Sequence, residues 1–174
     1  GLLGRGRSMV AEASLPENVC VKLLRCTPRE LADLNLRKNL VGSIAAGSLR
    51  SANAHAANML LAFYLATGQD AANILEGSQA TTHVEEREGD VYVSCTLPNL
   101  IVGTAGAGKD LPFVRENLEA LGCLADADAG ASARRLAAIA AAVVLCGELS
   151  LLAAQTQPGE LMRAHVALER DGGR

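Results

Sequence analysis

Hydrophobic and polar positions alternate with a period of two in three parts of the chain, and each part predicts a β-strand. Residues 8–15 alternate loosely and precede a proline, as a short strand does. Residues 81–86 and 90–96 flank Arg87-Glu88-Gly89, an arrangement that is typical of a hairpin. We expect the second hairpin strand to end at Pro98, because proline has no amide hydrogen to donate to a neighbouring strand.

Helical patterns occupy most of the remaining chain. Thr27-Pro28-Arg29-Glu30 combines an N-cap, a proline at the first helical position and a glutamate at N3, which predicts a helix running toward the glycines at 42–47. Residues 51–65 predict a second helix, apolar on nearly every side and therefore buried. An exposed loop is expected at 125–130, and further helices at 70–75, 113–121, 131–154 and 159–169. The elements together predict an α+β fold, a mainly helical layer packed on a small antiparallel sheet.

The amino-acid composition limits which side chains can form the core and which classes of partner the chain can bind. The chain has 174 residues, of which 49% are hydrophobic but only 2% aromatic, so one domain must build its core from small and medium side chains. A chain this apolar is not expected to be disordered. A net charge of −3 and the scarcity of rings to stack on bases argue against nucleic acid as a partner.

Cysteine spacing and the lengths of apolar runs exclude two further classes. The five cysteines lack metal-ligand spacing, so we expect no metal site and interpret them as reduced, small core side chains: Cys20, Cys26, Cys95, Cys123 and Cys146. The longest apolar run, residues 136–147, is about twelve residues long, whereas a membrane span needs ~20. We therefore expect no membrane span in this segment.

Several polar residues have both a structural and a chemical interpretation. Asp70 stands before a predicted helix, where its side chain would cap free amides, and the alternative is a catalytic carboxylate. His55 stands with Asn53 and Asn58 among small apolar residues. It is either a hydrogen-bonded core histidine or part of a ligand pocket, because buried polar groups need partners.

The same choice applies to three other features. His165 either complements the dipole at a helix C-terminus or, in a cleft, donates a proton near neutral pH. Lys38 is either a surface lysine or an anchor for an anion. Residues 103–108 match GxxGxG rather than the GxGxxG of dinucleotide-binding folds, and their small side chains permit close approach by a ligand or another chain.

Seven short segments, in order and with similar spacing, resemble the carboxyl-terminal part of the large domain of the 3-hydroxy-3-methylglutaryl-CoA (HMG-CoA) reductase family. The resemblance covers essentially the whole chain and is closer to the eukaryotic and archaeal class. It implies that residues 1–174 are an α+β portion of that large domain, with the small NADPH-binding domain outside them. The segments are Arg37-Lys38-Asn39-Leu40-Val41-Gly42-Ser43, Asn53-Ala54-His55-Ala56-Ala57-Asn58, Thr67-Gly68-Gln69-Asp70-Ala71-Ala72, Ser94-Cys95-Thr96-Leu97-Pro98, Val102-Gly103-Thr104, Gly147-Glu148-Leu149-Ser150-Leu151 and Arg163-Ala164-His165.

The resemblance implies an oxidoreductase of the mevalonate pathway of isoprenoid biosynthesis, which reduces HMG-CoA to mevalonate and CoA with two NADPH. Asp70 matches a catalytic aspartate that tunes the protonation of a lysine and a glutamate, both of which the family carries upstream of this segment. His165 matches the histidine that protonates the departing CoA thiolate. Activity is therefore expected to need residues outside this chain.

Binding residues also follow from the resemblance. Lys38 matches a lysine that binds the free carboxylate of the substrate, and Arg170 an arginine near the cofactor. Two further sets match the substrate pocket, at Ala54, His55 and Asn58, and a backbone approach to the nicotinamide, at Ala105, Gly106 and Ala107.

Family members assemble as dimers or larger oligomers with active sites between subunits, so a homo-oligomer is expected. Its expected location is the cytoplasm, or the cytosolic face of a membrane if the parent chain carries an anchor. Departures from the family at Arg50-Ser51-Ala52, Ile101 and Ala107 favour an alternative, a non-catalytic interaction module or degenerate fragment that keeps the fold. A binder of CoA esters without turnover is a third interpretation.

Overall fold

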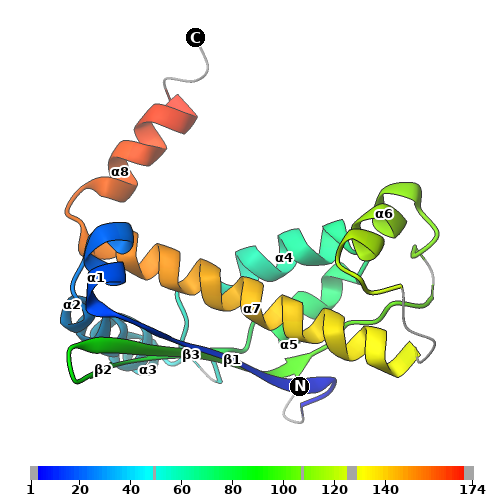
Figure 1. Cartoon of the computed structure of the whole chain (residues 1–174), viewed down its shortest axis with the longest axis horizontal. Helices are drawn as coiled ribbons and strands as arrows, with labels where there is room; N and C mark the ends of the chain where they lie inside the picture. The colour runs from blue at the N-terminus through cyan, green and yellow to red at the C-terminus, as the bar shows by residue number, and fades with distance from the viewer. Residues whose placement is uncertain (1–3, 49, 107, 125–128, 171–174) are drawn as a thin grey trace.

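A long central helix lies across a small sheet and organises the protein (Figure 1). The computed structural model describes residues 4–48, 50–106, 108–124 and 129–170. Helix α7 (Ala129–Thr156) packs on strands β1 (Arg7–Leu15) and β3 (Asp90–Leu100), and α4 (Ala56–Ala66) lies against it. This arrangement confirms the predicted α+β fold, with helices packed on an antiparallel sheet.

The sheet has three strands in the order β1-β3-β2, and both pairings are antiparallel. Strand β2 (Thr81–Arg87) and β3 form the predicted hairpin, whose turn residues Glu88 and Gly89 both have positive φ, at 54° and 92°. The expected end at Pro98 is wrong, because β3 continues to Leu100. β2 pairs with β3 only as far as Thr96, so Pro98 lies beyond that partner and its missing amide hydrogen breaks no bond between these two strands.

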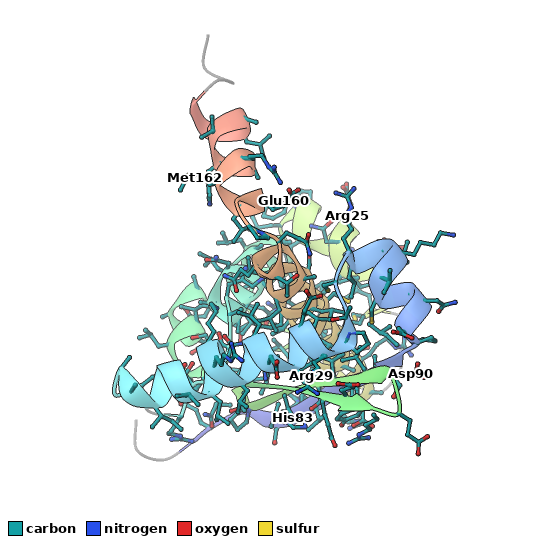
Figure 2. All side chains as sticks on the ribbon, turned by 90° about the vertical axis from the view of Figure 1, so that its left-hand side faces the viewer. Arg25, Arg29, His83, Asp90, Glu160 and Met162 are labelled. Atoms are coloured by element: carbon teal, nitrogen blue, oxygen red, sulfur yellow. The ribbon has the colours of Figure 1, made fainter. Side chains whose placement is uncertain are left out.

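The first predicted helix is confirmed, cap included. The Thr27 hydroxyl accepts a hydrogen bond from the Glu30 amide at 3.2 Å, and the Glu30 carboxylate accepts one from the Thr27 amide at 2.8 Å. α2 (Pro28–Leu34) then continues as the π-helix η2 (Asn35–Gly42) and the short α3 (Ser43–Ala45). Figure 2 shows these consecutive helical elements lying along the β-hairpin that carries His83.

Helix α4 begins at Ala56, five residues later than predicted. The Asn53 side chain accounts for the late start, because it accepts a hydrogen bond from the Ala56 amide at 3.1 Å. Its amide group also donates to the carbonyls of Ser78 and Ala80. Residues 51–55 are therefore held as a loop by contacts with a distant part of the chain, which local periodicity does not reveal.

The remaining elements agree with the predictions at most positions. The predicted 125–130 loop is partly wrong, because 129 and 130 belong to α7, while 125–128 lie outside the described residues. Two short helices after β1, α1 (Glu17–Val19) and η1 (Cys20–Leu24), were not predicted. The others are η3 (Ala71–Asn73), α5 (Ile74–Gly77), α6 (Pro112–Ala120), α8 (Glu160–His165) and η4 (Val166–Arg170).

The core lies between the inner sheet face and helices α4 and α7. Val91, Val93 and Cys95 of the central strand are fully buried there, with Leu136 of α7 and Leu60 of α4. Four cysteines are core residues as expected, but the fifth, Cys146, is exposed.

Within the described residues, one helix, at Gly130–Thr156, is long and apolar enough to cross a membrane, judged by length and composition. The apolar run of residues 136–147 is shorter than this helix, because Glu148 interrupts the run while the helix continues to Thr156. In the most apolar 18-residue stretch of this helix, 56% is buried inside the protein. The helix therefore has the character of a core helix, and its apolar residues serve contacts with β1, β3 and α4.

We expect Leu60→Ala to lower the free energy of unfolding by about 2–5 kcal/mol, because it leaves a cavity between α4 and the core. Leu65→Ala on the same helix is the matched control. That side chain is 58% exposed, so the control should change stability by less than about 0.5 kcal/mol. Urea unfolding followed by circular dichroism measures both, and equal losses would contradict the packing described.

Candidate functional site

A fully buried carboxylate, Glu148, lies within α7 and joins three parts of the chain. Its Oε2 accepts a hydrogen bond from the Ala54 amide at 2.6 Å, and its Oε1 accepts one from the His55 amide at 2.7 Å. The Thr82 hydroxyl of β2 also donates to Oε2, at 2.7 Å. Sequence reasoning quoted Glu148 within a motif but gave it no role; the available signal was a lone acid within an apolar helix.

The loop before α4 is held against α7 at the predicted substrate residues. His55 is half-buried, and its ring Nε2 lies 2.7 Å from the carbonyl oxygen of Gly147, next to Glu148. The His55 ring is therefore hydrogen-bonded, as the structural interpretation of this residue expects. Asn58, one turn into α4, is exposed. Ala54 and His55 thus belong to the neighbourhood of Glu148, while Asn58 faces outward.

Lys38 of η2 approaches the same carboxylate. It is half-buried, and its Nζ donates to the Asn39 side chain at 3.2 Å. Burial lowers the pKa of Lys38, whereas the negative charge of Glu148 raises it. We call Lys38, Ala54, His55, Thr82 and Glu148 the Glu148 cluster.

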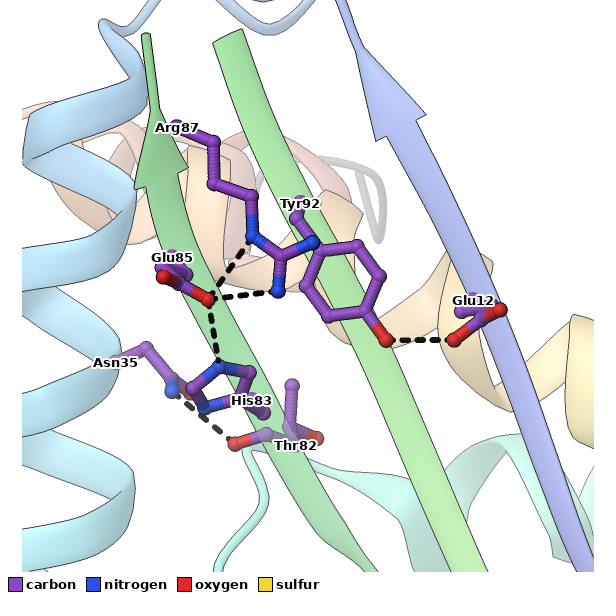
Figure 3. Close-up of polar contacts among 7 residues, drawn as sticks. All are labelled: Glu12, Asn35, Thr82, His83, Glu85, Arg87 and Tyr92. Carbon is purple, nitrogen blue, oxygen red and sulfur yellow. Dashed lines mark hydrogen bonds and ion pairs between the residues drawn. The ribbon is translucent and has the colours of Figure 1, made fainter.

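Hydrogen bonds of two buried asparagines connect η2 to the Glu148 cluster. The Asn39 side chain donates to Asn35 Oδ1 at 2.8 Å. Asn35 in turn donates to the Thr82 backbone carbonyl at 3.1 Å (Figure 3). Asn35 and Asn39 are both buried, so their bonds are shielded from water. The lysine is therefore carried on a helix whose position relative to β2 is fixed.

Buried Cys95 borders the cluster without adding a charge. Its sulfur lies 3.9 Å from the Thr82 hydroxyl. Burial is the main cause that raises its pKa to about 12, and the nearby Glu148 adds to the effect. The thiol is thus neutral at physiological pH and fits a packing role.

A second set of contacts ties the Asp70 loop to the glycine segment. The Gln69 side chain donates to the Gly103 carbonyl at 3.0 Å and accepts from the Gly103 amide at 2.9 Å. Lys109 Nζ donates to the Thr67 carbonyl at 3.1 Å. Two segments more than thirty residues apart in the sequence are therefore fixed side by side.

Asp70 itself is exposed and caps the short helix η3. Its Oδ1 accepts a hydrogen bond from the Ala72 amide at 3.0 Å, which confirms the N-cap interpretation. A cap needs only one of the two carboxylate oxygens, and the side chain remains open to solvent. The structural role is therefore compatible with a chemical one.

The glycine segment presents open backbone beside this loop. Ala105 and Gly106 are exposed, and Gly106 has a φ of +113°; no atom of the described residues would lie within 4 Å of a Cβ at this position. A Cβ at Gly103 would meet its nearest neighbour only at 4.0 Å. A flat ligand could thus approach the backbone here. Ala107 and the side chain of Arg170 lie outside the described residues.

His165 lies apart from these groups. It is the exposed last residue of α8, which packs mainly on α7 and η4 and projects from the body of the protein (Figure 1). Figure 2 shows the same projection at Glu160 and Met162. Asp70 follows α4, which contacts α7 and, near its end, α6. Helices α8 and α6 lie at opposite ends of α7 (Figure 1), so the structure does not bring the two predicted catalytic residues together within one chain.

The outer face of the sheet carries a set of polar side chains that contact one another at the protein surface. The Arg87 guanidinium lies 3.9 Å from the Tyr92 ring centre, and Tyr92 donates to Glu12 at 2.6 Å (Figure 3). Hydrogen bonds from Arg87 and His83 lower the pKa of Glu85. Contacts of this kind between exposed groups stabilise a protein only slightly.

Comparison with known proteins gives a single result across the chain. The model of the family described as hydroxymethylglutaryl-coenzyme A reductase matches residues 2–170. A 3-hydroxy-3-methylglutaryl-coenzyme A reductase of Aeropyrum pernix is 48% identical over 172 residues, covering 98% of this chain and 40% of that protein. The protein of the same name from Pyrococcus horikoshii is 47% identical over 171 residues, covering 97% and 41%. The one from Strongylocentrotus purpuratus is 42% identical over 172 residues, covering 96% and 18%.

This chain therefore spans only about two fifths of the length of the first two relatives.

We expect Gly68→Ala to destabilise the Asp70 loop by about 1–3 kcal/mol. Gly68 has a φ of +63°, and a Cβ there would lie 2.9 Å from a Val114 methyl carbon. Gly47→Ala is the control, because Gly47 has a φ of +73° but, among the parts of the chain that the structure describes, no atom would lie within 4 Å of its Cβ. Denaturant unfolding should show the larger loss at Gly68, and equal losses would contradict the close packing there.

Proposed function

The chain belongs to the hydroxymethylglutaryl-coenzyme A reductase family, and we propose that it contributes part of an active site that reduces HMG-CoA to mevalonate and free CoA with two NADPH. The observation that carries this proposal is the pair of hydrogen bonds between Gln69 and Gly103. They fix an exposed carboxylate, Asp70, in the loop next to open glycine backbone. A carboxylate beside a surface that admits a flat ring suits a reduction by hydride transfer.

The proposed reaction converts a thioester to an alcohol in two reductions. The first hydride adds to the thioester carbonyl carbon, and the carbon–sulfur bond then breaks to give an aldehyde and a thiolate. The second hydride adds to the aldehyde carbon, and a proton on its oxygen completes the alcohol. NADPH supplies both hydrides when bound.

The residues of this chain fit a nicotinamide at residues 103–106. Gly106 and Gly103 leave the backbone uncovered, and the Gln69 contacts hold that backbone in place. In the proposal, Ala105, Gly106 and Ala107 offer close contact to the ring, and Arg170 lies near the cofactor. A larger side chain in this stretch would fill the open space.

Asp70 is proposed to act in proton transfer. Its hydrogen bond to Ala72 fixes the side chain at the start of η3, and its exposure leaves it open to groups from other parts of the full protein. It would tune a lysine and a glutamate that the longer protein contributes, so that they polarise the carbonyl. This chain alone would then lack half of the catalytic groups.

His165 is proposed to protonate the departing CoA thiolate. A thiolate is a much stronger nucleophile than a thiol, so the proton prevents its return to the aldehyde. Because α8 projects from the body of the protein, the proposal includes a homo-oligomer in which this helix reaches a site shared between subunits. The exposed Met162 and Leu168, at 63% and 79%, support a packing partner for it.

Lys38 is proposed to bind the free carboxylate of the substrate, with Ala54, His55 and Asn58 lining the pocket. The half-buried ammonium group supports this role, since a partly desolvated cation binds an anion more strongly than an exposed one. The proposed location is the cytoplasm or the cytosolic face of a membrane.

Asp70→Asn tests the proposed proton transfer, because asparagine can still cap η3 while the charge is lost. The assay uses a chimeric protein, called the joined reductase below, in which this chain replaces the matched segment of the Aeropyrum pernix protein. We expect HMG-CoA-dependent oxidation of NADPH to fall at least about 100-fold. Asp33→Asn, in a surface ion pair, is the control and should keep full activity. Unchanged activity of Asp70→Asn would rule out the assigned role.

His165→Gln tests the proton to the thiolate in the same joined reductase. We expect reduction of HMG-CoA to fall at least about tenfold while reduction of added mevaldehyde is largely kept, because only the first reaction releases a thiolate. Both rates are followed by the absorbance of NADPH. Equal losses would contradict this role, and binding of CoA without any turnover in the unsubstituted protein would favour the non-catalytic alternative.

A further inference from the structure

Glu148 is a charged group that the proposed reaction does not use, although it lies next to three of the residues proposed to bind the substrate, Lys38, Ala54 and His55. Burial of a carboxylate is unfavourable unless donors and an opposite charge compensate for the lost water. The amides of Ala54 and His55 and the Thr82 hydroxyl provide the donors. Lys38 provides the opposite charge.

We propose that Glu148 is a positioning residue for substrate binding, which holds the Ala54–His55 backbone through both oxygens and keeps Lys38 charged for the carboxylate of the substrate. The inference rests on the proposed function and deepens it. Glu148 is buried and acts through Lys38 and His55, so it is not itself expected to touch the substrate.

Both oxygens of Glu148 must be acceptors for this arrangement. Oε1 faces one amide hydrogen, and Oε2 faces another amide and a hydroxyl. A glutamine in the same place would direct its own NH₂ group at one of these donors. The site therefore selects a carboxylate rather than any polar side chain.

His55 is held twice by neighbouring residues of α7. Its amide donates to Glu148, and its ring Nε2 contacts the Gly147 carbonyl oxygen. Gly147 permits this approach, because a Cβ there would lie within 3 Å of the Met59 sulfur. The close contact of α4 with α7 thus sets where the pocket histidine lies.

The charge of Glu148 acts on Lys38 against the effect of burial. Desolvation lowers the pKa of Lys38, and Glu148 is the charged residue that raises it. The nearby Cys95 thiol is neutral at physiological pH, since its pKa is about 12. Arg37, the neighbour of Lys38, is exposed and pairs with Asp33. Loss of the Glu148 charge should therefore move the deprotonation of Lys38 to lower pH.

Glu148→Gln in the joined reductase tests the proposal. We expect the KM for HMG-CoA to rise about tenfold or more, with a smaller change in kcat. The KM for mevaldehyde should rise as well, because it carries the same free carboxylate, while the KM for NADPH should not change. The alkaline limb of kcat/KM should move to lower pH, because Lys38 loses its proton earlier.

Glu148→Asp separates charge from position. It keeps the negative charge but is shorter by one methylene, so we expect a raised KM for HMG-CoA without a shift of the alkaline limb. Should Glu148→Gln fail to fold, this variant decides, and an unchanged KM would overturn the proposal. Ser132→Ala, at another buried polar position of α7, is the control for stability and should change neither KM nor pH profile.

Two failures are distinguishable. If the unsubstituted joined reductase turns over HMG-CoA and folded Glu148→Gln keeps its KM values and pH profile, the positioning role is wrong while the proposed function stands. If the unsubstituted protein binds HMG-CoA but does not oxidise NADPH, the proposed function fails and this inference fails with it.

Discussion

A carboxylate removed from water requires donors that are held in place, and at Glu148 these donors come from three regions of the chain. The helix α7 supplies the acid, the loop before α4 supplies two amides, and β2 supplies a hydroxyl. Each donor is brought into range by apolar packing of α4 and the sheet on α7. The polar contacts then restrict that packing to one register, because a shift would leave a buried charge without partners.

The second constraint acts on the loops. Gln69 satisfies both backbone groups of Gly103, and Lys109 binds the carbonyl of Thr67, so the Asp70 loop and the glycine segment are fixed as a pair. These contacts leave Asp70 and Gly106 exposed. The chain thus has two separate groups of candidate site residues, one around Lys38 and one beside Asp70. His165 lies on a helix that projects away from both groups. The proposed function accounts for this division by a site that other parts of a longer protein and a second subunit complete.

Much of the fold could be predicted because its signals are local. The Thr27–Glu30 capping box, the alternation around the hairpin turn and the apolar length of α7 each depend on a few neighbouring residues. The late start of α4 could not be predicted, since Asn53 bonds to Ser78 and Ala80 instead of continuing a helix. The passage of β3 through Pro98 depends on where β2 begins, because Thr81 pairs with Thr96. The exposure of Cys146 depends on which face of α7 meets α4.

The sequence by itself determined the types of secondary-structure element, the family and the candidate residues, because periodicity, helix caps and motifs each depend on residues that are close together in the chain. Only the tertiary structure decided how those residues act on one another. It placed Glu148 against Ala54, His55 and Thr82, and it put the charge of that acid near Lys38. A glutamate in an apolar helix has many potential partners in a sequence. Its actual partners follow from packing, since burial makes each unsatisfied donor or acceptor costly.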